Sequence, residues 1–142
     1  AIALDSTSRD ACNNLGLAYL NIGRYSEAEV FLKKTISLDS KIANPRKHLG
    51  MVYFKTKRTQ EARQNFLKAI ELNPYYTPAL LGMAYVLADE VKTGEAFGYV
   101  EQAIGKGSTF AQLESDEDLV LLRALPEWKI LMKKHFPDQA KD

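Results

Sequence analysis

Groups of residues recur every 34 positions along this 142-residue chain. The segment Leu15-Gly16-x-x-Tyr19 returns as Leu49-Gly50-x-x-Tyr53. A fixed period of this length indicates an array of stacked helical hairpins, because each unit cannot bury its apolar face alone and packs on its neighbours. The other recurring positions are Ala28, Ala62 and Ala96; Glu27, Glu61 and Glu95; and Ile36, Ile70 and Ile104.

Two apolar stripes at helical spacing explain the composition of each unit. Leu15 and Tyr19 lie four residues apart on one face of a first helix, called helix A, and Gly16 between them admits a neighbouring backbone. Ala28, Leu32 and Ile36 form the stripe of a second helix, helix B, with the small alanine where two helices cross closely. Each unit is therefore predicted to be a pair of helices.

The pattern resembles the tetratricopeptide repeat, whose signature combines Trp-x-x-Leu-Gly-x-x-Tyr with a later Ala-x-x-x-Phe and Pro. This resemblance implies an all-α fold, a right-handed α-solenoid of antiparallel helix pairs. The usual Trp is replaced by Cys12, Arg46 and Leu80, and the third unit is degenerate. The second unit carries most of the signature, at Leu49, Gly50, Tyr53, Ala62, Phe66, Ala69 and Pro74.

The first residues match the end of helix B one period further on. Ala1-Ile2-Ala3-Leu4-Asp5-Ser6 aligns with Thr35-Ile36-Ser37-Leu38-Asp39-Ser40. We therefore expect the chain to begin inside a preceding repeat and to be a fragment of a longer array. The predicted divisions are a tail of a preceding repeat at 1–8, repeats at 9–42, 43–76 and 77–110, capping helices at 111–137 and a tail at 138–142.

The expected beginning of the chain inside a preceding repeat has two consequences. The lack of a signal peptide gives no information about the compartment, so the localisation stays unknown. Ile2 and Leu4 keep helix B spacing without the helix A that should pack beside them. Because the uncovered apolar face at the end of a solenoid tends to pack on another molecule, we expect weak self-association through this N-terminal face.

After Ile104 the period is lost, and two short helical patterns follow. We predict that Ser115 caps the first, with Asp118 three residues later, and that Pro126 opens the second. Trp128 is expected to be buried near Val100 and Ile104. The segment resembles the closing element that ends many bacterial tetratricopeptide arrays. Helix capping is favoured over metal binding for the acidic run at 116–118, because no His or Cys lies nearby in the sequence.

Composition and charge exclude several classes of function. No apolar run approaches membrane-spanning length, so no membrane contact is predicted for this segment. Residues 9–76 hold twelve Lys and Arg against six Asp and Glu, whereas 77–142 hold seven against eleven. The cations are scattered among acids rather than gathered in a stripe, so no nucleic-acid binding is predicted.

The sequence contains no pattern typical of an enzyme. It has no phosphate loop, paired-His helix or nucleophile elbow, and His48 and His135 are far apart. Cys12 falls on a core-facing position and is interpreted as a small buried hydrophobe. We predict no catalytic residue, no cofactor and no metal.

The resemblance implies a concave groove, lined by helix A side chains, that binds a protein or peptide partner. Its apolar floor would come from Leu, Met, Phe and Tyr side chains, and its polar contacts from Asn and Lys. A structural spacer or a regulatory array attached to another domain is the alternative. Burial of Phe54 and Tyr85 by the closing helices would favour the spacer. The predicted groove residues are Asn13, Leu17, Leu20, Asn21, Lys47, Met51, Phe54, Lys55, Leu81 and Tyr85.

Some members of the family grip the acidic C-terminal tails of heat-shock chaperones with a clamp of Lys, Asn, Asn, Lys and Arg. One Asn stands here where a Lys is needed, and the other charges of the clamp are missing. Without a cationic fork there is little to hold a carboxylate pair. The corresponding positions of this chain are Asn13, Leu17, His48, Pro78 and Gly82.

Overall fold

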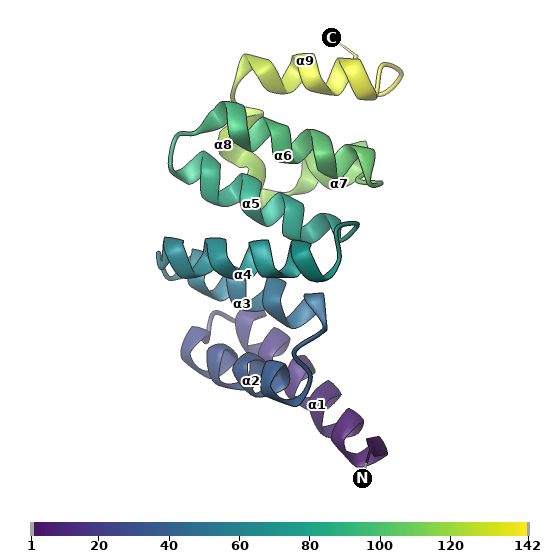
Figure 1. Cartoon of the computed structure of the whole chain (residues 1–142). Coiled ribbons are helices and arrows are strands. Elements are labelled where there is room, and N and C mark those ends of the chain that lie inside the picture. The colour runs from purple at the N-terminus through teal and green to yellow at the C-terminus, as the bar shows by residue number, and fades with distance from the viewer. Residues whose placement is uncertain (1, 142) are drawn as a thin grey trace. The chain divides into compact units, whose positions relative to one another are not determined.

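The computed structural model describes residues 2–141, and their side chains from residue 8 onward. Within this range the chain is all-helical, without strands, as predicted (Figure 1). It divides into two compact units, Ala1–Ala79 and Leu80–Asp142. The helices are α1 (Ile2–Asn21), α2 (Tyr25–Leu38), α3 (Ala43–Lys55), α4 (Thr59–Leu72), α5 (Thr77–Asp89), α6 (Thr93–Gly105), α7 (Phe110–Ser115), the short 3-10 helix η1 (Glu117–Leu119), α8 (Val120–Arg123) and α9 (Pro126–His135).

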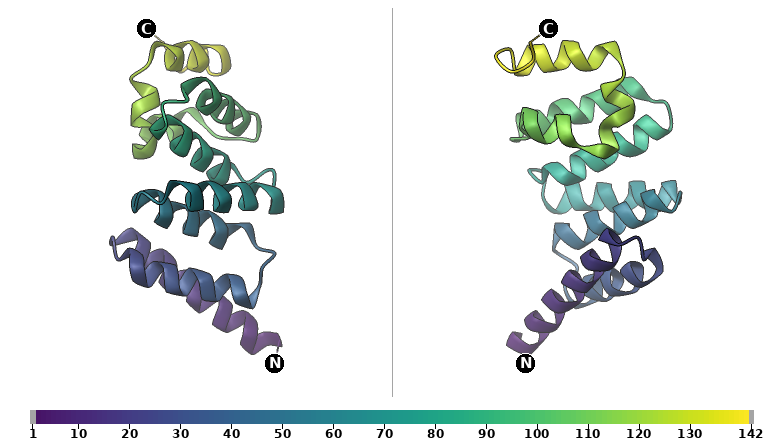
Figure 2. Two further views of the ribbon diagram at one scale, coloured as in Figure 1. Left: turned by 60° about the vertical axis from the view of Figure 1, so that its left-hand side comes forward. Right: turned by 180° about the vertical axis from the view of Figure 1, so that it is seen from behind.

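The first unit consists of two antiparallel hairpins, α1 with α2 and α3 with α4 (Figure 2). Helix α3 also packs on α2 and lies beside α1, so the hairpins are stacked. The helix B stripes form the core: Ala28, Leu32, Ala62 and Phe66 are fully buried. The recurring small and large residues of the sequence are therefore the contacts that hold each pair together.

A glycine in each A helix allows the helix pair to approach closely. A Cβ atom at Gly16 would lie 2.7 Å from the side chain of Leu32, and one at Gly50 would lie 2.8 Å from the ring of Phe66. Both distances are below van der Waals contact, so any larger residue would push the B helix away. This explains why glycine recurs with the 34-residue period.

The turns between A and B helices share one backbone geometry. In each turn, a backbone amide donates a hydrogen bond of 2.8 Å to the carbonyl five residues earlier, as Arg58 does to Tyr53. The residue before that amide lies in the left-handed region, with φ of 80° at Gly23, 65° at Lys57 and 62° at Val91. Only glycine adopts this conformation without strain.

We expect Val91→Gly to stabilise the protein by about 1 kcal/mol, because a β-branched residue is strained at positive φ. Val91 is exposed, so the substitution removes no core contact. Urea denaturation followed by circular dichroism measures the change. The mirror substitution, Gly23→Val, should destabilise by a similar amount. Destabilisation by both variants would contradict a strained turn at Val91.

Helix α1 differs from the expected break between repeats. The predicted division places a tail of a preceding repeat at 1–8 and the first repeat at 9–42, yet the helical backbone runs without interruption from Ile2 to Asn21. The predicted self-association depends on the side chains of Ile2 and Leu4, which lie outside the described residues. The origin of residues 1–8 in a preceding repeat stays a prediction.

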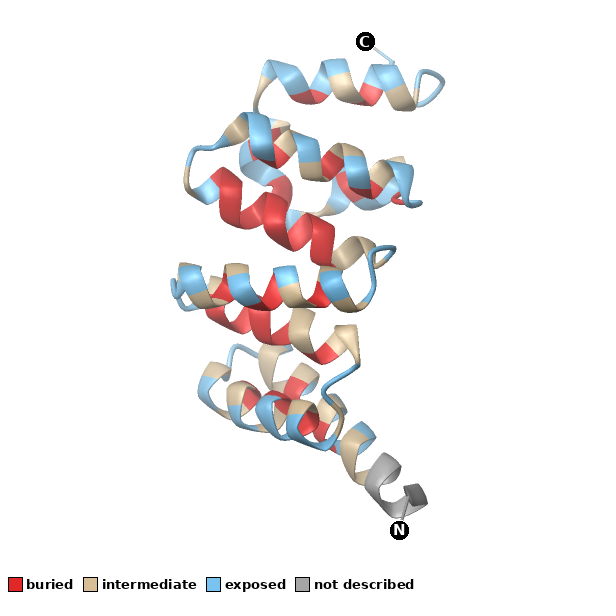
Figure 3. Ribbon diagram, in the orientation of Figure 1, coloured by how far each residue is buried: buried red, intermediate tan, exposed pale blue. Residues whose placement is uncertain are grey.

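The second unit begins with the α5–α6 pair, at the position expected for the third repeat. Residues 79–88 of α5 are all buried, as the red ribbon of Figure 3 shows. Helices α7 and α8 lie on one side of this pair, behind it in Figure 1 and in front in the right-hand view of Figure 2. Leu113, Leu119 and Leu122 are fully buried and anchor them.

The capping prediction for this segment is wrong in one detail. Ser115 is the last residue of α7, and its hydroxyl donates to the carbonyl of Ala111 at 2.8 Å. The residue that caps the next turn is Asp116, whose carboxylate accepts from the amide of Asp118 at 2.9 Å. Helix α7 itself begins with a capping box between Thr109 and Gln112, which was not predicted.

The last helix begins at Pro126, as predicted. Glu101 of α6 accepts hydrogen bonds from Lys134 at 2.8 Å and interacts with His135 at 2.6 Å, which ties α9 to α6. Trp128 is buried, in agreement with the prediction. Its indole N–H donates to Glu114 of α7 at 3.1 Å, so the closing helices also hold one another.

Candidate functional site

The predicted groove residues of the first unit form two matching stripes on neighbouring helices. On both α1 and α3 the spacing is i, i+4, i+7, i+8, and the stripes are one 34-residue period apart. Helices α1 and α3 lie beside each other. We call these eight residues the A-helix surface: Asn13, Leu17, Leu20 and Asn21 of α1, and Lys47, Met51, Phe54 and Lys55 of α3.

Burial across the A-helix surface is graded. Met51 is 8% exposed, while Leu17, Leu20 and Phe54 are half-buried. Asn21 and Lys55 are exposed at the C-terminal ends of their helices, and the Lys55 ammonium lies 6.0 Å from the centre of the Phe54 ring. The arrangement offers an apolar strip with polar groups at its edge, the usual division of a protein-binding patch.

Hydrogen bonds between side chains connect successive repeats at the other end of this surface. The Asn13 amide donates to the Asn44 oxygen at 3.1 Å, and the Asn44 amide donates to the Tyr76 hydroxyl at 2.9 Å. Burial raises the pKa of Tyr76, and the bond from Asn44 opposes this. Asn13 was predicted to form hydrogen bonds with peptide carbonyls, but one of its side-chain N–H groups already donates to Asn44 of α3.

His48 lies in the interior of α3 rather than on the groove. It is buried, and desolvation together with the charge of Lys47 lowers its pKa to about 4. At neutral pH the ring is therefore uncharged, and its Nδ1 atom has no hydrogen-bond partner within the described structure. The histidine is a packing residue and supplies no positive charge to a ligand.

This burial predicts a loss of stability in acid. Above pH 6.5 the ring is neutral in both folded and unfolded states and contributes nothing. Between pH 6.5 and pH 4 the unfolded chain binds a proton that folded His48 does not, so the free energy of unfolding falls by about 3 kcal/mol. Chemical denaturation of the protein and of His48→Gln at both ends of this range isolates the effect. An equal decline in the two proteins would show that His48 is not its source.

The two predicted groove residues of the second unit are not available to a partner in this structure. Leu81 and Tyr85 are both buried, Tyr85 being 8% exposed. The Tyr85 hydroxyl donates to the carboxylate of Asp116 in the closing segment. Burial and the Asp116 charge raise the pKa of Tyr85, so it remains a donor. The prediction that Tyr85 anchors a peptide is corrected: the chain's own closing segment occupies that position.

A polar network behind the A-helix surface was missed by sequence reasoning. Glu29 of α2 accepts from the Tyr53 hydroxyl at 2.9 Å and from Arg58 at 3.1 Å. The Arg58 guanidinium lies 4.4 Å from the Tyr53 ring centre, and Arg24 lies over Tyr19 in the same way at 5.2 Å. The signal in the sequence is an arginine five residues after each of these tyrosines. The network fixes α3 against α2 and so positions the A-helix surface.

No three His, Cys, Asp or Glu side chains of residues 2–141 gather in a way that would hold a metal ion. Over the same range, no helix combines the length and apolar character needed to span a membrane.

Two family models, both described as tetratricopeptide repeat, match residues 10–42 and 45–76. They correspond to the α1–α2 and α3–α4 hairpins. None of the curated proteins gives a significant sequence match.

Several solved structures share the fold. The first TPR of Spaghetti (RPAP3) bound to the HSP90 peptide SRMEEVD is 22% identical, with a TM-score of 0.71, and the match covers 84% of this chain and 94% of that chain. The Arabidopsis OM64 TPR domain is 18% identical, with a TM-score of 0.68 and coverage of 92% and 95%. MamA is 25% identical, with a TM-score of 0.68 and coverage of 93% and 71%. These similarities establish the helical-hairpin architecture.

Proposed function

This chain is a tetratricopeptide repeat protein, and we propose that it acts as a protein-interaction module that binds an extended or helical segment of a partner along the A-helix surface. The observation that carries the proposal is the strip of half-buried Leu17, Leu20 and Phe54 over buried Met51. Apolar side chains grouped on a preformed surface supply contact area for a partner, and a few of them dominate the affinity.

Two further observations support this class of function. The family is a scaffold family and is typically non-catalytic, and we propose that this chain likewise catalyses no reaction. Two of the similar structures, the first and second TPR of Spaghetti, are complexes with an HSP90 peptide. Their binding of a peptide supports a peptide or partner helix as the type of ligand here.

The identity of that ligand is expected to differ. We predict no measurable binding of the peptide SRMEEVD, because Asn13, Pro78 and Gly82 stand where the clamp needs Lys, Lys and Arg. Acidic groups bind tightly only where cationic donors are positioned for them. Fluorescence polarisation with a labelled peptide measures this, with the first TPR of Spaghetti as the positive control. Micromolar affinity for this chain would contradict the prediction.

A peptide library displayed on phage and selected on the immobilised chain tests the proposal without a known partner. Selected peptides should lose at least about fivefold in affinity with Phe54→Ala or Leu17→Ala, since truncated anchors cost about 1 kcal/mol or more. Leu67→Ala is the matched control, because Leu67 is an exposed apolar residue of helix α4 outside the A-helix surface. If no peptide is selected, or if the control variant loses affinity equally, the proposal is wrong.

A structural spacer is the second candidate, and one observation favours it. The Tyr85–Asp116 contact closes the corresponding A-helix position of the second unit. In a pure spacer the A-helix surface would also have no ligand. The selection experiment separates the two functions, because a spacer yields no peptide that depends on Phe54.

A further inference from the structure

Helix α1 leaves one of its faces exposed. Ala11, Leu15, Ala18 and Ile22 follow one another at intervals of four, three and four residues, so they form one stripe along the helix. The amide of Ile22 donates to the carbonyl of Ala18 at 3.2 Å, which continues the helical spacing just beyond the end of α1. Helices α2 and α3 pack on α1 but do not cover this face, since Leu15 is 43% exposed and Ile22 is 66% exposed. We call these four residues the α1 stripe.

The same positions are buried in the other two A helices. One period after Leu15, Leu49 of α3 is 3% exposed, and one period later Met83 of α5 is also 3% exposed. Val52, the counterpart of Ala18, is buried as well. Helix α3 has the α1–α2 hairpin to pack on, whereas no described segment covers the α1 stripe. The α1 stripe is therefore a packing face of the repeat that lacks its partner within the described chain.

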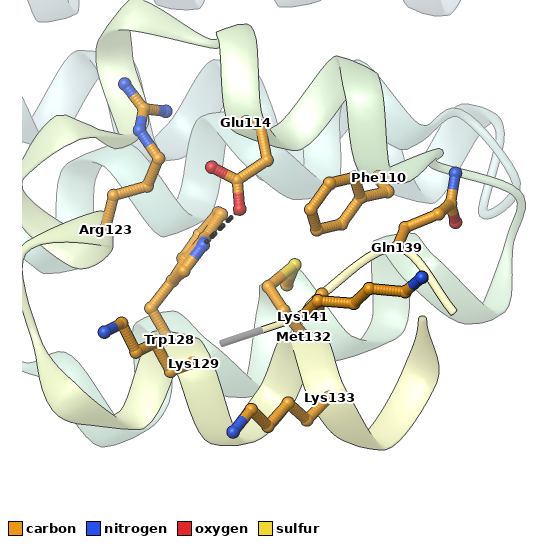
Figure 4. A pocket seen from close by; sticks show the side chains of 10 residues that line it. Phe110, Glu114, Arg123, Trp128, Lys129, Met132, Lys133, Gln139 and Lys141 are labelled. Carbon is orange, nitrogen blue, oxygen red and sulfur yellow. Dashed lines mark hydrogen bonds between the residues drawn. The ribbon is translucent and has the colours of Figure 1, made fainter. Parts of the chain in front are cut away.

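The second unit shows how apolar side chains are covered where the repeats end. Trp128 and Met132 of α9 are buried, and the indole N–H of Trp128 donates to Glu114 of α7, as the dashed line in Figure 4 marks. The first unit has no comparable closing helix among its described residues. Covering the α1 stripe therefore requires a helix from outside the described chain.

The α1 stripe is uncharged and alternates in size. The small side chains of Ala11 and Ala18 alternate with the large side chains of Leu15 and Ile22, and the exposed neighbour Asn14 is also uncharged. In a two-fold dimer each copy presents the same patch to the other, so a charged patch would meet like charge. A face without charge meets an identical face without repulsion, and it offers no counter-charge to a charged partner.

We propose that a second copy of this chain covers the α1 stripe, with the two α1 helices antiparallel about a two-fold axis. When the axis passes between Leu15 and Ala18, Leu15 of one copy meets Ala18 of the other, and Ile22 of one copy meets Ala11 of the other. Every large side chain then lies against a small one, which lets the two helices pack closely along the whole stripe. A parallel arrangement in register would instead place leucine on leucine and alanine on alanine. The proposal rests on none of residues 1–7.

The A-helix surface stays open in such a dimer. Its α1 residues Asn13, Leu17 and Leu20 each follow a member of the α1 stripe by two positions, a rotation of about 200° around the helix axis. The two sets of side chains therefore lie on different sides of α1. The dimer contact does not depend on the function proposed for the A-helix surface.

Sedimentation velocity of the chain between about 10 µM and about 1 mM tests the proposal. A contact between two helices is smaller than a standard interface, so we expect a dimer with a Kd of about 0.1–0.5 mM. Ala18→Glu and Ala18→Lys each place like charges on either side of the axis and should weaken the dimer at least about tenfold. An equal mixture of the two variants replaces repulsion with attraction and should associate at least about fivefold more tightly than either variant alone.

Val30→Glu is the matched control, because Val30 is an exposed apolar residue of α2 outside the α1 stripe. It should leave the dimer unchanged. Thermal melts followed by circular dichroism establish that the variants are folded, as the exposure of Ala18 leads us to expect. A monomer over the whole concentration range, equal weakening by Val30→Glu, or a mixture that associates no more tightly than its components would overturn the proposal.

Discussion

Replacing Trp128 with alanine is expected to lower the free energy of unfolding of the second unit by about 3–5 kcal/mol. The side chain is 3% exposed, lies beside Met132 and spans from α9 to Glu114 on α7. Truncation leaves a cavity and removes the link between the two closing helices. Because the variant lacks tryptophan fluorescence, thermal and urea denaturation are followed by circular dichroism.

Ile130→Ala is the control for this substitution. Ile130 belongs to the same helix but is 68% exposed, so its truncation should change stability by less than about 0.5 kcal/mol. If Trp128→Ala and Ile130→Ala melt at the same temperature, the closing helices are a loose attachment rather than part of the core.

Replacing Phe66 with alanine is expected to cost the first unit a similar amount, about 3–5 kcal/mol. Phe66 is fully buried on α4 and fills the space above Gly50 of α3. Its neighbour Leu67 is 42% exposed and serves as the control, since Leu67→Ala removes little buried surface. Urea denaturation compares both variants with the parent, and equal losses would contradict the packing described here.

The contact between Gly50 and Phe66 can be measured separately by a double-mutant cycle. Gly50→Ala alone should destabilise by about 1–3 kcal/mol, because its Cβ would lie 2.8 Å from the Phe66 ring. Phe66→Leu moves that ring carbon away, so the double variant should be more stable than the sum of the two losses predicts, by about 1 kcal/mol. Strict additivity would place the Gly50 effect outside this contact.

The sequence predicted the helix pairs because the same residue types recur where the helices meet. Ala28, Ala62 and Ala96 are all fully buried, one period apart. Such positions depend only on the contact between a helix and its own partner, and that contact is repeated in every unit. Local spacing and the period therefore specify the same structure.

The parts of the chain outside the period were predicted less well. Helix α7 falls within the predicted capping helices at 111–137, but Ser115 was expected to begin the first of them, and the Thr109–Gln112 capping box went unrecognised. Tyr85 was assigned to the groove because Leu17 and Met51 occupy the equivalent positions. Its actual partner, Asp116, comes from a segment with no counterpart in the repeat, so no periodic argument could have found it.

For the A-helix surface, the burial of each side chain decides which of the predicted groove residues remain accessible to a partner. Leu17, Leu20 and Phe54 on α1 and α3 are half-buried, whereas Met51 of α3 and Leu81 and Tyr85 of α5 are buried. Sequence spacing gives the face on which a residue lies, but not what later segments of the chain place over it. The proposed binding surface is therefore restricted to the first unit.

The central claim is that a protein segment binds along α1 and α3, and amide chemical-shift mapping of the isotope-labelled chain with a selected peptide tests it most directly. We expect the largest shifts in the stripes that contain Leu17, Leu20 and Phe54, and we expect them to disappear in Phe54→Ala. Shifts confined to the second unit, or to the exposed face of α4 around Leu67, would contradict the claim.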